Sequence, residues 1–412
     1  MERDASSYRV LRMQREYLKL VAANMINRFG DSIDVIAFSW IMYQITQSAS
    51  LMALLLGLNY VPTILLQPLT GSLVERLPKK RVMVICDLLR GLITAMVVLL
   101  YARQLLTPAM LAVVTVVNST VEAFRTPAGV SIVPLLLEER HYTIGVAFNQ
   151  TLSRAVELVG LAVAGGIIAL VGYETALLID AITFVLSALL IALVSAQETG
   201  SAGEPRWRDI FHDFLEGMRL VRRHEVLPPL LFLAALINLT LVPLSAFATV
   251  YVAEWLEGDA TLLSIVQFLL VGGTMIGSAM CPKLRRPGRR AQLLLFGLLG
   301  SISLAMLGLG ARLPSWHLRL AVALASCLLQ GVSAGVLNVL FSSSLMRNVP
   351  KPYLARLSGL SNSVMTCSIP LGSLICSVLA ALVPVPSALL ASAVFSAVLY
   401  LCTLPMHGLN KL

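Results

Sequence analysis

The chain has 412 residues, of which 57% are apolar and only 13% are charged, and its formal net charge is +9. Soluble domains carry about a quarter of charged residues, so this composition excludes a soluble globular protein. A transmembrane helix needs about 20 mostly apolar residues, so the chain has room for roughly twelve of them and none for a large domain outside the membrane.

The segment before the first apolar run, residues 1–19, is rich in basic side chains and lacks the small-residue cleavage site of a signal peptide. We therefore expect a retained cytoplasmic segment. It has the spacing of an amphipathic helix on the membrane surface, carried by Tyr8, Leu11, Arg12, Arg15 and Leu18. A frayed basic tail fits the same residues.

Apolar runs bounded by Pro, Gly and charged residues predict two sets of six spans. The first set lies near residues 20–45, 50–74, 82–102, 107–133, 143–171 and 174–196. The second set lies near residues 227–253, 260–281, 291–311, 317–343, 355–383 and 386–406. We expect an all-α membrane protein with 12 transmembrane helices in two six-helix bundles, residues 1–196 and 227–412. Residues 197–226, the only long polar connection, would be a cytoplasmic linker.

The distribution of the 31 basic residues predicts the orientation, because short cytoplasmic loops are enriched in Lys and Arg. With both termini inside, most of them lie on the cytoplasmic side, and the outer loops hold only Arg103, Arg312 and Arg319. Orientation in a cytoplasmic membrane and contact with anionic lipids thus explain the positive charge. No nucleic-acid partner is expected.

The two halves of the sequence also match each other at ordered positions. Asn27 in the first predicted span corresponds to Asn238 in the seventh, and Gly160 in the fifth corresponds to Gly372 in the eleventh. Such internal repeats are typical of transporters whose substrate site lies between the repeats.

Ionisable residues at bilayer depth cost about 2.5–3.5 kcal/mol each on the insertion scale, so they persist mainly when paired, solvated or functional. They are concentrated in the predicted spans of the first half, as Arg28, Asp31, Asp34, Asp87, Arg90, Glu122, Arg125, Arg154, Glu157 and Asp180. We expect the proton and substrate sites among Arg28, Asp31, Asp34, Glu122, Arg154 and Glu157, together with the amides of Asn27 and Asn238.

Asp31 is the first candidate for the proton site. It lies roughly 16 Å along its helix from the cytoplasmic end, near the middle of the bilayer. Arg28 and Asp34 lie three residues away on either side and share its helix face, so they have opposing effects on its proton affinity. A static ion pair between Arg28 and Asp31 is the alternative. Arg154 and Glu157 either pair with each other or reach the carboxylates of the first span.

The remaining charged residues of the first half have structural interpretations. We expect Arg125 to form a structural ion pair and Asp180 to pack between helices. The second half has neutral polar residues in its spans instead, with a wall rich in Met and Leu. This contrast suits an amphipathic or cationic organic substrate better than a sugar or a small anion.

Enzymatic chemistry is not expected from this sequence. It has no nucleophile with a base, no phosphate-binding glycine loop, no ATP motif and no metal-ligand spacing. The six cysteines are scattered through apolar stretches and are interpreted as small buried hydrophobes. We therefore expect no cofactor and no metal, and transport driven by a proton or substrate gradient.

Residues 71–81, Gly-Ser-Leu-Val-Glu-Arg-Leu-Pro-Lys-Lys-Arg, resemble the signature loop between the second and third helices of the major facilitator superfamily. Glu75 stands where that family has aspartate, and Pro78 where it has a second glycine. The resemblance implies two bundles around a central cavity, alternating access and a working monomer. It also implies a cytoplasmic latch made of Gly71, Glu75, Arg76, Lys79, Lys80 and Arg81, with Asp87 and Arg90 in its charge network.

Residues 27–31, 86–90 and 124–128 are similar to the drug and siderophore exporter branch, which includes macrolide efflux proteins and the enterobactin exporter. Residues 160–166 resemble the antiporter motif of the family, with Leu161 in place of its usual proline, although close packing of small residues explains the same pattern. The resemblance implies a drug:proton antiporter that exports small molecules. The alternatives are a proton-coupled importer, a flippase for a lipid-like substrate, or a transport-dead sensor or scaffold.

Overall fold

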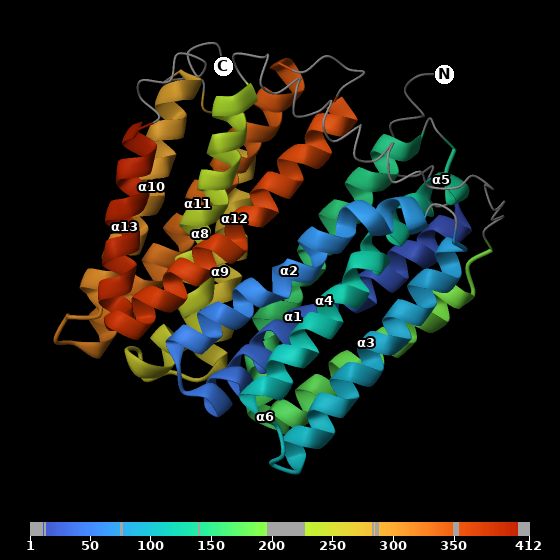
Figure 1. Cartoon of the computed structure of the whole chain (residues 1–412), viewed down its shortest axis with the longest axis horizontal. Coiled ribbons are helices and arrows are strands. Elements are labelled where there is room, and N and C mark those ends of the chain that lie inside the picture. Colours follow the sequence, from blue (N-terminus) through green and yellow to red (C-terminus); the bar gives the residue numbers. More distant parts are fainter. Residues whose placement is uncertain are drawn as a thin grey trace. The chain divides into compact units, whose positions relative to one another are not determined.

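The computed structural model describes residues 11, 14–74, 77–138, 141–195, 227–281, 284, 288–348 and 354–402. All of the secondary-structure elements in these ranges are helices (Figure 1). They are α1 Arg15–Thr46, α2 Ala49–Val74, α3 Lys79–Ala102, α4 Pro108–Ser131, α5 Val133–Leu136, α6 Tyr142–Ala192, α8 Leu227–Glu254, α9 Ala260–Met280, α10 Arg289–Gly310, α11 Trp316–Asn348, α12 Leu354–Leu382 and α13 Val385–Cys402. The predicted linker, residues 197–226, lies outside the described residues.

Nine helices in the described part of the chain are long and apolar enough to cross a membrane. The helices α1 and α4 are not among them, because charged residues such as Asp31, Asp34, Glu122 and Arg125 lower their mean hydropathy. The all-α membrane fold is therefore confirmed, while the number of 12 spans stays a prediction.

The helix α6 contains the predicted span 143–171 and most of the predicted span 174–196, and it turns back at Gly172. Gly172 has φ +79° and ψ 170°, a backbone conformation that residues with a Cβ rarely adopt. Both ends of α6 reach the start of α1: the Tyr17 hydroxyl donates to Gly145 O at 2.7 Å, and Ser195 N donates to Glu16 Oε2 at 2.6 Å. One glycine thus replaces the loop between two spans.

The chain divides into two compact units, Met1–Ile45 with Val61–Pro205 and Thr46–Tyr60 with Arg206–Leu412. The helix α2 belongs to both. Its first part is held by α12, where Ser50 Oγ and Ser377 Oγ lie 2.9 Å apart. Its second part is held by α4, where Thr70 Oγ1 donates to Ala123 O at 2.7 Å.

In the first unit, glycines bring α1 close to α6. A side chain at Gly30 would collide with Asp180 and Thr183, and a Cβ at Gly160 would lie 2.6 Å from Ser32 Cβ. The motif around Gly160 therefore has a packing role. An apolar cluster around Tyr17, which includes side chains from α1, α3, α4 and α6, fills one end of this unit.

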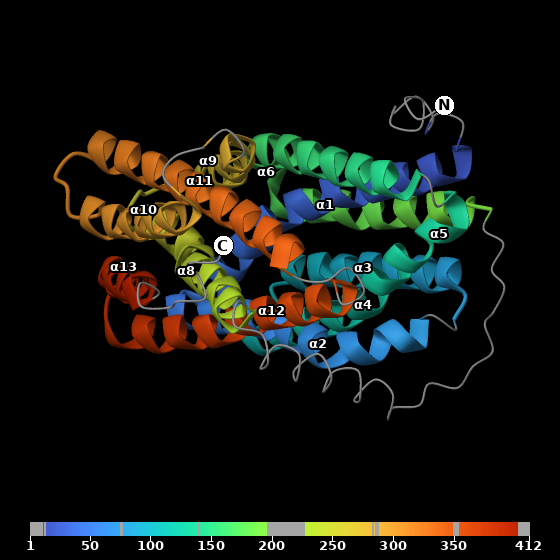
Figure 2. The ribbon, with the colours of Figure 1, turned by 90° about the horizontal axis from the view of Figure 1, so that it is seen from above.

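In the second unit, α9 and α11 pack backbone against backbone. A Cβ at Gly273 would lie 2.6 Å from Leu328 O, and added Cβ atoms at Gly277 and Gly335 would collide with backbone oxygens of the opposite helix. The helices α10, α11 and α13 lie side by side (Figure 2), around an apolar core that includes Leu293, Phe296, Val336, Leu337 and Tyr400.

Candidate functional site

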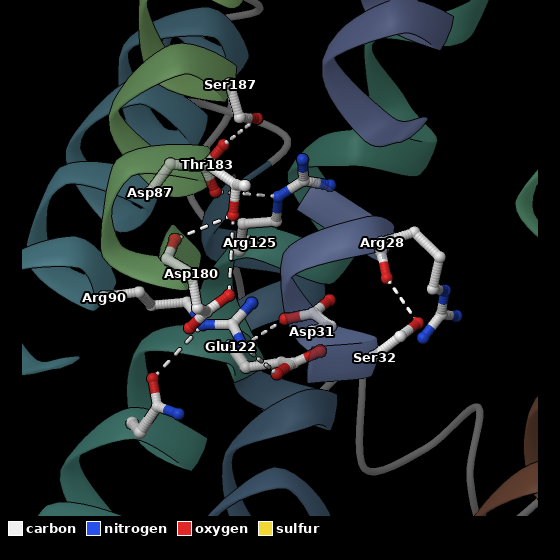
Figure 3. Close-up of polar contacts among 11 residues, drawn as sticks. Arg28, Asp31, Ser32, Asp87, Arg90, Glu122, Arg125, Asp180, Thr183 and Ser187 are labelled. Atoms are coloured by element: carbon white, nitrogen blue, oxygen red, sulfur yellow. Dashed lines mark hydrogen bonds and ion pairs between the residues drawn. The ribbon is translucent and has the colours of Figure 1, made fainter. Parts of the chain in front are cut away.

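A cluster of ionisable and polar side chains occupies the interior of the first unit, where α1, α3, α4 and α6 meet (Figure 3). We call it the charged cluster. Its members are Asn24, Asp31, Asp34, Asp87, Arg90, Asn118, Glu122, Arg125, Asp180, Thr183 and Ser187. The glycines that bring α1 against α6 place these groups together.

Arg90 is at the centre of the charged cluster. Its Nη2 lies 3.1 Å from Asp31 Oδ1 and 3.6 Å from Glu122 Oε2. Its Nε donates to Asn118 Oδ1 at 3.2 Å, and its Cζ lies 4.3 Å from the centre of the Phe184 ring, a cation–π contact. One buried guanidinium therefore links all four helices, with two carboxylates competing for it.

Arg125 forms a second, closed ion pair. Its Nε lies 3.1 Å from Asp87 Oδ1, and its Nη2 donates to Asn24 Oδ1 at 3.0 Å. The other oxygen of Asp87 accepts a hydrogen bond from the Ser187 hydroxyl at 2.7 Å. Asp87 is fully buried and bonded at both oxygens. Such an arrangement braces the helices, as expected of Arg125.

Asp180 differs from the other acids of the charged cluster. It is fully buried, and its Oδ1 lies 3.5 Å from the Thr183 hydroxyl, which also donates to the Asp180 backbone oxygen at 2.7 Å. Among the described residues, its Oδ2 has no hydrogen-bond partner. Its charged neighbours on α1 are Asp31 and Asp34. Asp34 is half-buried.

The predicted residues outside this centre are placed as follows. Arg28 accepts a hydrogen bond from Ser32 through its backbone oxygen, and Figure 3 shows its guanidinium pointing away from Asp31. Asp31 is thus paired with Arg90 of another helix. Arg154 and Glu157 pair with each other at 2.9 Å on α6.

Asn27 and Asn238 lie in different units. Asn27 is buried on α1, and its Oδ1 has no partner among the described residues, whereas Asn238 is half-buried on α8. Of the predicted latch, Gly71 lies in the last turn of α2, and Lys79, Lys80 and Arg81 begin α3. Glu75 and Arg76 lie outside the described residues.

Four neutral members of the charged cluster were not predicted from the sequence: Asn24, Asn118, Thr183 and Ser187. Helical spacing in the sequence could have indicated two of them, Asn118 and Thr183. Asn118 is four residues before Glu122, and Thr183 is three residues after Asp180, so each shares a helix face with an acid. Asn24 and Ser187 pair only across helices, and spacing along one helix does not report such pairs.

The sequence profile of the Major Facilitator Superfamily matches residues 20–373. Macrolide efflux protein A of Streptococcus pyogenes is 22% identical over 366 residues, which are 89% of each chain. The multidrug efflux pump Tap of Mycobacterium tuberculosis is 23% identical over 371 residues, covering 86% of this chain and 85% of the pump.

Solved structures give the same result for the fold. The nucleoside transporter NupG superimposes with a TM-score of 0.73 at 15% identity, covering 95% of this chain and 98% of that one. A bacterial homologue of the iron transporter ferroportin gives 0.70 at 18% identity, covering 94% and 98%. The chain therefore belongs to the Major Facilitator Superfamily and is a multi-pass membrane transporter, not an enzyme, with efflux pumps among its relatives.

Proposed function

We propose that the protein exports small amphipathic or cationic organic molecules by alternating access, in exchange for protons, and that Asp31 and Glu122 bind both. The observation that carries this proposal is the sharing of one buried guanidinium, Arg90, between two more accessible carboxylates. The side chain of Arg90 is 8% exposed, against 27% for Asp31 and 49% for Glu122.

The exposed side of this arrangement is acidic, which favours a cation. The guanidinium is less exposed than the two carboxylates, and its single positive charge balances only one of their two negative charges. A substrate with a protonated amine and an apolar body would pair with the carboxylate that Arg90 leaves free. The efflux pumps among the relatives support export as the direction.

The charge balance of the cluster supports protons as the exchanged ion. Five carboxyl groups, those of Asp31, Asp34, Asp87, Glu122 and Asp180, lie near three guanidinium groups, those of Arg28, Arg90 and Arg125. Full ionisation would leave an excess of negative charge inside the protein, which is costly in a medium of low dielectric constant. Protons or a cationic substrate would remove that excess, and the two would compete for the same carboxylates.

The other predicted residues have supporting roles in this proposal. Asp34, Arg28, Asn27, Arg154 and Glu157 would contact the substrate or the proton path in the first unit. Asn238 is kept as a separate candidate in the second unit. Residues 71–81 would act as the cytoplasmic latch of alternating access, with Asp87 and Arg90 beside it. The basic residues of the predicted inner loops support a location in the cytoplasmic membrane with both termini inside. We propose a working monomer on the family resemblance alone.

Proton flux in proteoliposomes tests the proposal. Tetraphenylphosphonium or erythromycin is added to liposomes that contain the protein and a trapped pH dye. We expect proton release that depends on the added compound, its loss in Asp31→Asn, and its retention in Glu174→Gln, which changes an exposed carboxylate on α6. No proton movement with either compound in the native protein would refute exchange, and unchanged coupling in Asp31→Asn would remove Asp31 from the proton path.

A further inference from the structure

Asp180 occupies a position from which solvent is excluded on every side. The side chain is fully buried on the second half of α6. Gly30 of α1 packs directly over its carboxyl group, and Gly91 of α3 packs over the next residue, where an added Cβ would lie 3.1 Å from Ala181 O. Close backbone approach from two helices therefore seals this carboxyl group inside the unit.

The cation that faces Asp180 is Arg90, whose ion pairs in this structure are with other carboxylates. The charged groups that face it are Asp31 and Asp34 from α1 and Arg90 from α3. Arg90 is already bonded to Asp31, to Glu122 and to the amide of Asn118. A carboxylate in this position would have two acidic neighbours and one unpartnered oxygen, an arrangement that a buried charge does not tolerate. The protonated form of Asp180 suits this position, because it has no charge to be repelled by Asp31 and Asp34.

We propose that Asp180 is protonated in this arrangement and is the internal proton donor of the charged cluster. In the transfer step, the proton on the Asp180 carboxyl group moves to the carboxylate of Asp31 or Asp34, and Asp180 becomes a carboxylate. Arg90 then moves from Asp31 to Asp180, so that the number of paired charges is unchanged. The role of Asp180 as a donor rests on the proposed exchange of protons, but its protonation does not.

Thr183 is placed to assist this transfer. Its hydroxyl group has one proton, which in this arrangement is donated to the Asp180 backbone oxygen at 2.7 Å, while Asp180 Oδ1 is 3.5 Å away. Rotation of the hydroxyl group would direct that proton to the newly formed carboxylate. A hydrogen bond to a charged group is stronger than one to a neutral group, so Thr183 stabilises the state in which Asp180 has given up its proton.

Infrared spectroscopy of the purified protein tests the protonation without any substrate. At neutral pH, we expect the carbonyl stretch of a protonated carboxylic acid in the native protein, and its loss in Asp180→Asn, which has nearly the same shape. Glu174→Gln, on the same helix but exposed, serves as the control and should keep the band. An unchanged band in Asp180→Asn, or no such band in the native protein, would overturn the proposal.

Proton flux in proteoliposomes then tests the transfer. We expect Asp180→Asn to lose proton release driven by tetraphenylphosphonium while still allowing the compound to move down its own gradient. Thr183→Val, which keeps the acid, should keep the infrared band and slow proton release about tenfold, the effect of one lost hydrogen bond to a charged group. If Asp180→Asn does not fold, the same two readouts on Thr183→Val decide the matter, and unchanged release in Thr183→Val would contradict the proposal. Native protein that keeps the band but releases no protons would refute the proposed function and the donor role together, leaving the protonation in place.

Discussion

The interiors of the two units are stabilised in different ways. In the first unit, α1, α3, α4 and α6 meet around ion pairs centred on Arg90 and Arg125. In the second, α9 and α11 meet at glycines, and the buried polar residues in its described part are neutral, such as Ser303, whose hydroxyl is bonded to Gln330. Charge can be redistributed among ion pairs by moving a proton, whereas packed backbones have no such freedom. Under the proposed exchange of protons, we therefore expect the proton-transfer step in the first unit and a supporting role for the second.

Removing Arg90 should have the largest effect, because it breaks the arrangement that distinguishes the first unit. Arg90→Leu leaves Asp31 and Glu122 without their cation, and we expect a loss of about 3–5 kcal/mol in the free energy of unfolding. Thermal unfolding of the purified protein measures it. Arg103→Ala, at the exposed end of the same helix, is the control. Adding Asp31→Asn to Arg90→Leu should recover part of the loss, and a double variant no more stable than Arg90→Leu would argue against the pairing.

Separating α9 from α11 should have the next largest effect. In Gly335→Ala, the new methyl group meets Thr274 O and lies 2.9 Å from Ser278 N, so the two backbones must move apart. We expect a loss of about 1–3 kcal/mol in the free energy of unfolding, as for other overpacked sites. Gly166→Ala, where a Cβ meets nothing within 4 Å, should leave stability nearly unchanged. Equal effects in the two variants would contradict the close packing.

A neutral hydrogen bond of the second unit should matter less. Ser303→Ala removes the bond between Ser303 and Gln330, and hydrogen bonds between membrane helices contribute only about 0.6 kcal/mol on average. Thermal unfolding should show a loss of this order. Proton release in proteoliposomes should be the same as in the native protein, and a loss of coupling in Ser303→Ala would place part of the proton path in the second unit.

The smallest effect concerns Glu16, at the start of α1 and outside the predicted spans. Hydrogen bonds from Lys19 and from the Ser195 backbone lower the pKa of Glu16 below its ordinary value of 4.5. The stabilisation is therefore complete above about pH 4.5 and is lost as the pH falls through the lower folded-state pKa. Thermal unfolding should show Glu16→Gln slightly less stable than the native protein at neutral pH and equal to it in strong acid. A difference that grows on acidification would contradict this sign.

The membrane fold could be predicted from the sequence because hydropathy depends on composition over whole segments. The pairing within the site could not. The spacing of Arg28 and Asp31 indicated a shared helix face, yet the partner of Asp31 comes from α3, 59 residues further along the chain. Helical periodicity reports neighbours on one helix and carries no information on which helix lies opposite.

Asp180 illustrates the same limit. As an acid in a predicted span, it was expected to pack between helices, and nothing in the sequence indicates that Gly30 lies over its carboxyl group. The signature loop was better signalled, since its pattern is continuous in the sequence, although Glu75 and Arg76 lie outside the described residues. Local motifs were thus predictable, and groups assembled from four helices were not.

The turn of α6 at Gly172 has a consequence for insertion of the protein into the membrane. The two arms of α6 are joined without a connecting loop, so one arm has no spare chain length with which to cross the membrane before the other. We expect the two arms to insert together, so that their combined apolar length offsets the cost of inserting Asp180, which is at most about 2.5–3.5 kcal/mol, the value for a charged aspartate at the centre of a helix. The backbone conformation of Gly172, which lies outside the charged cluster, is therefore expected to matter for the biosynthesis of the first unit.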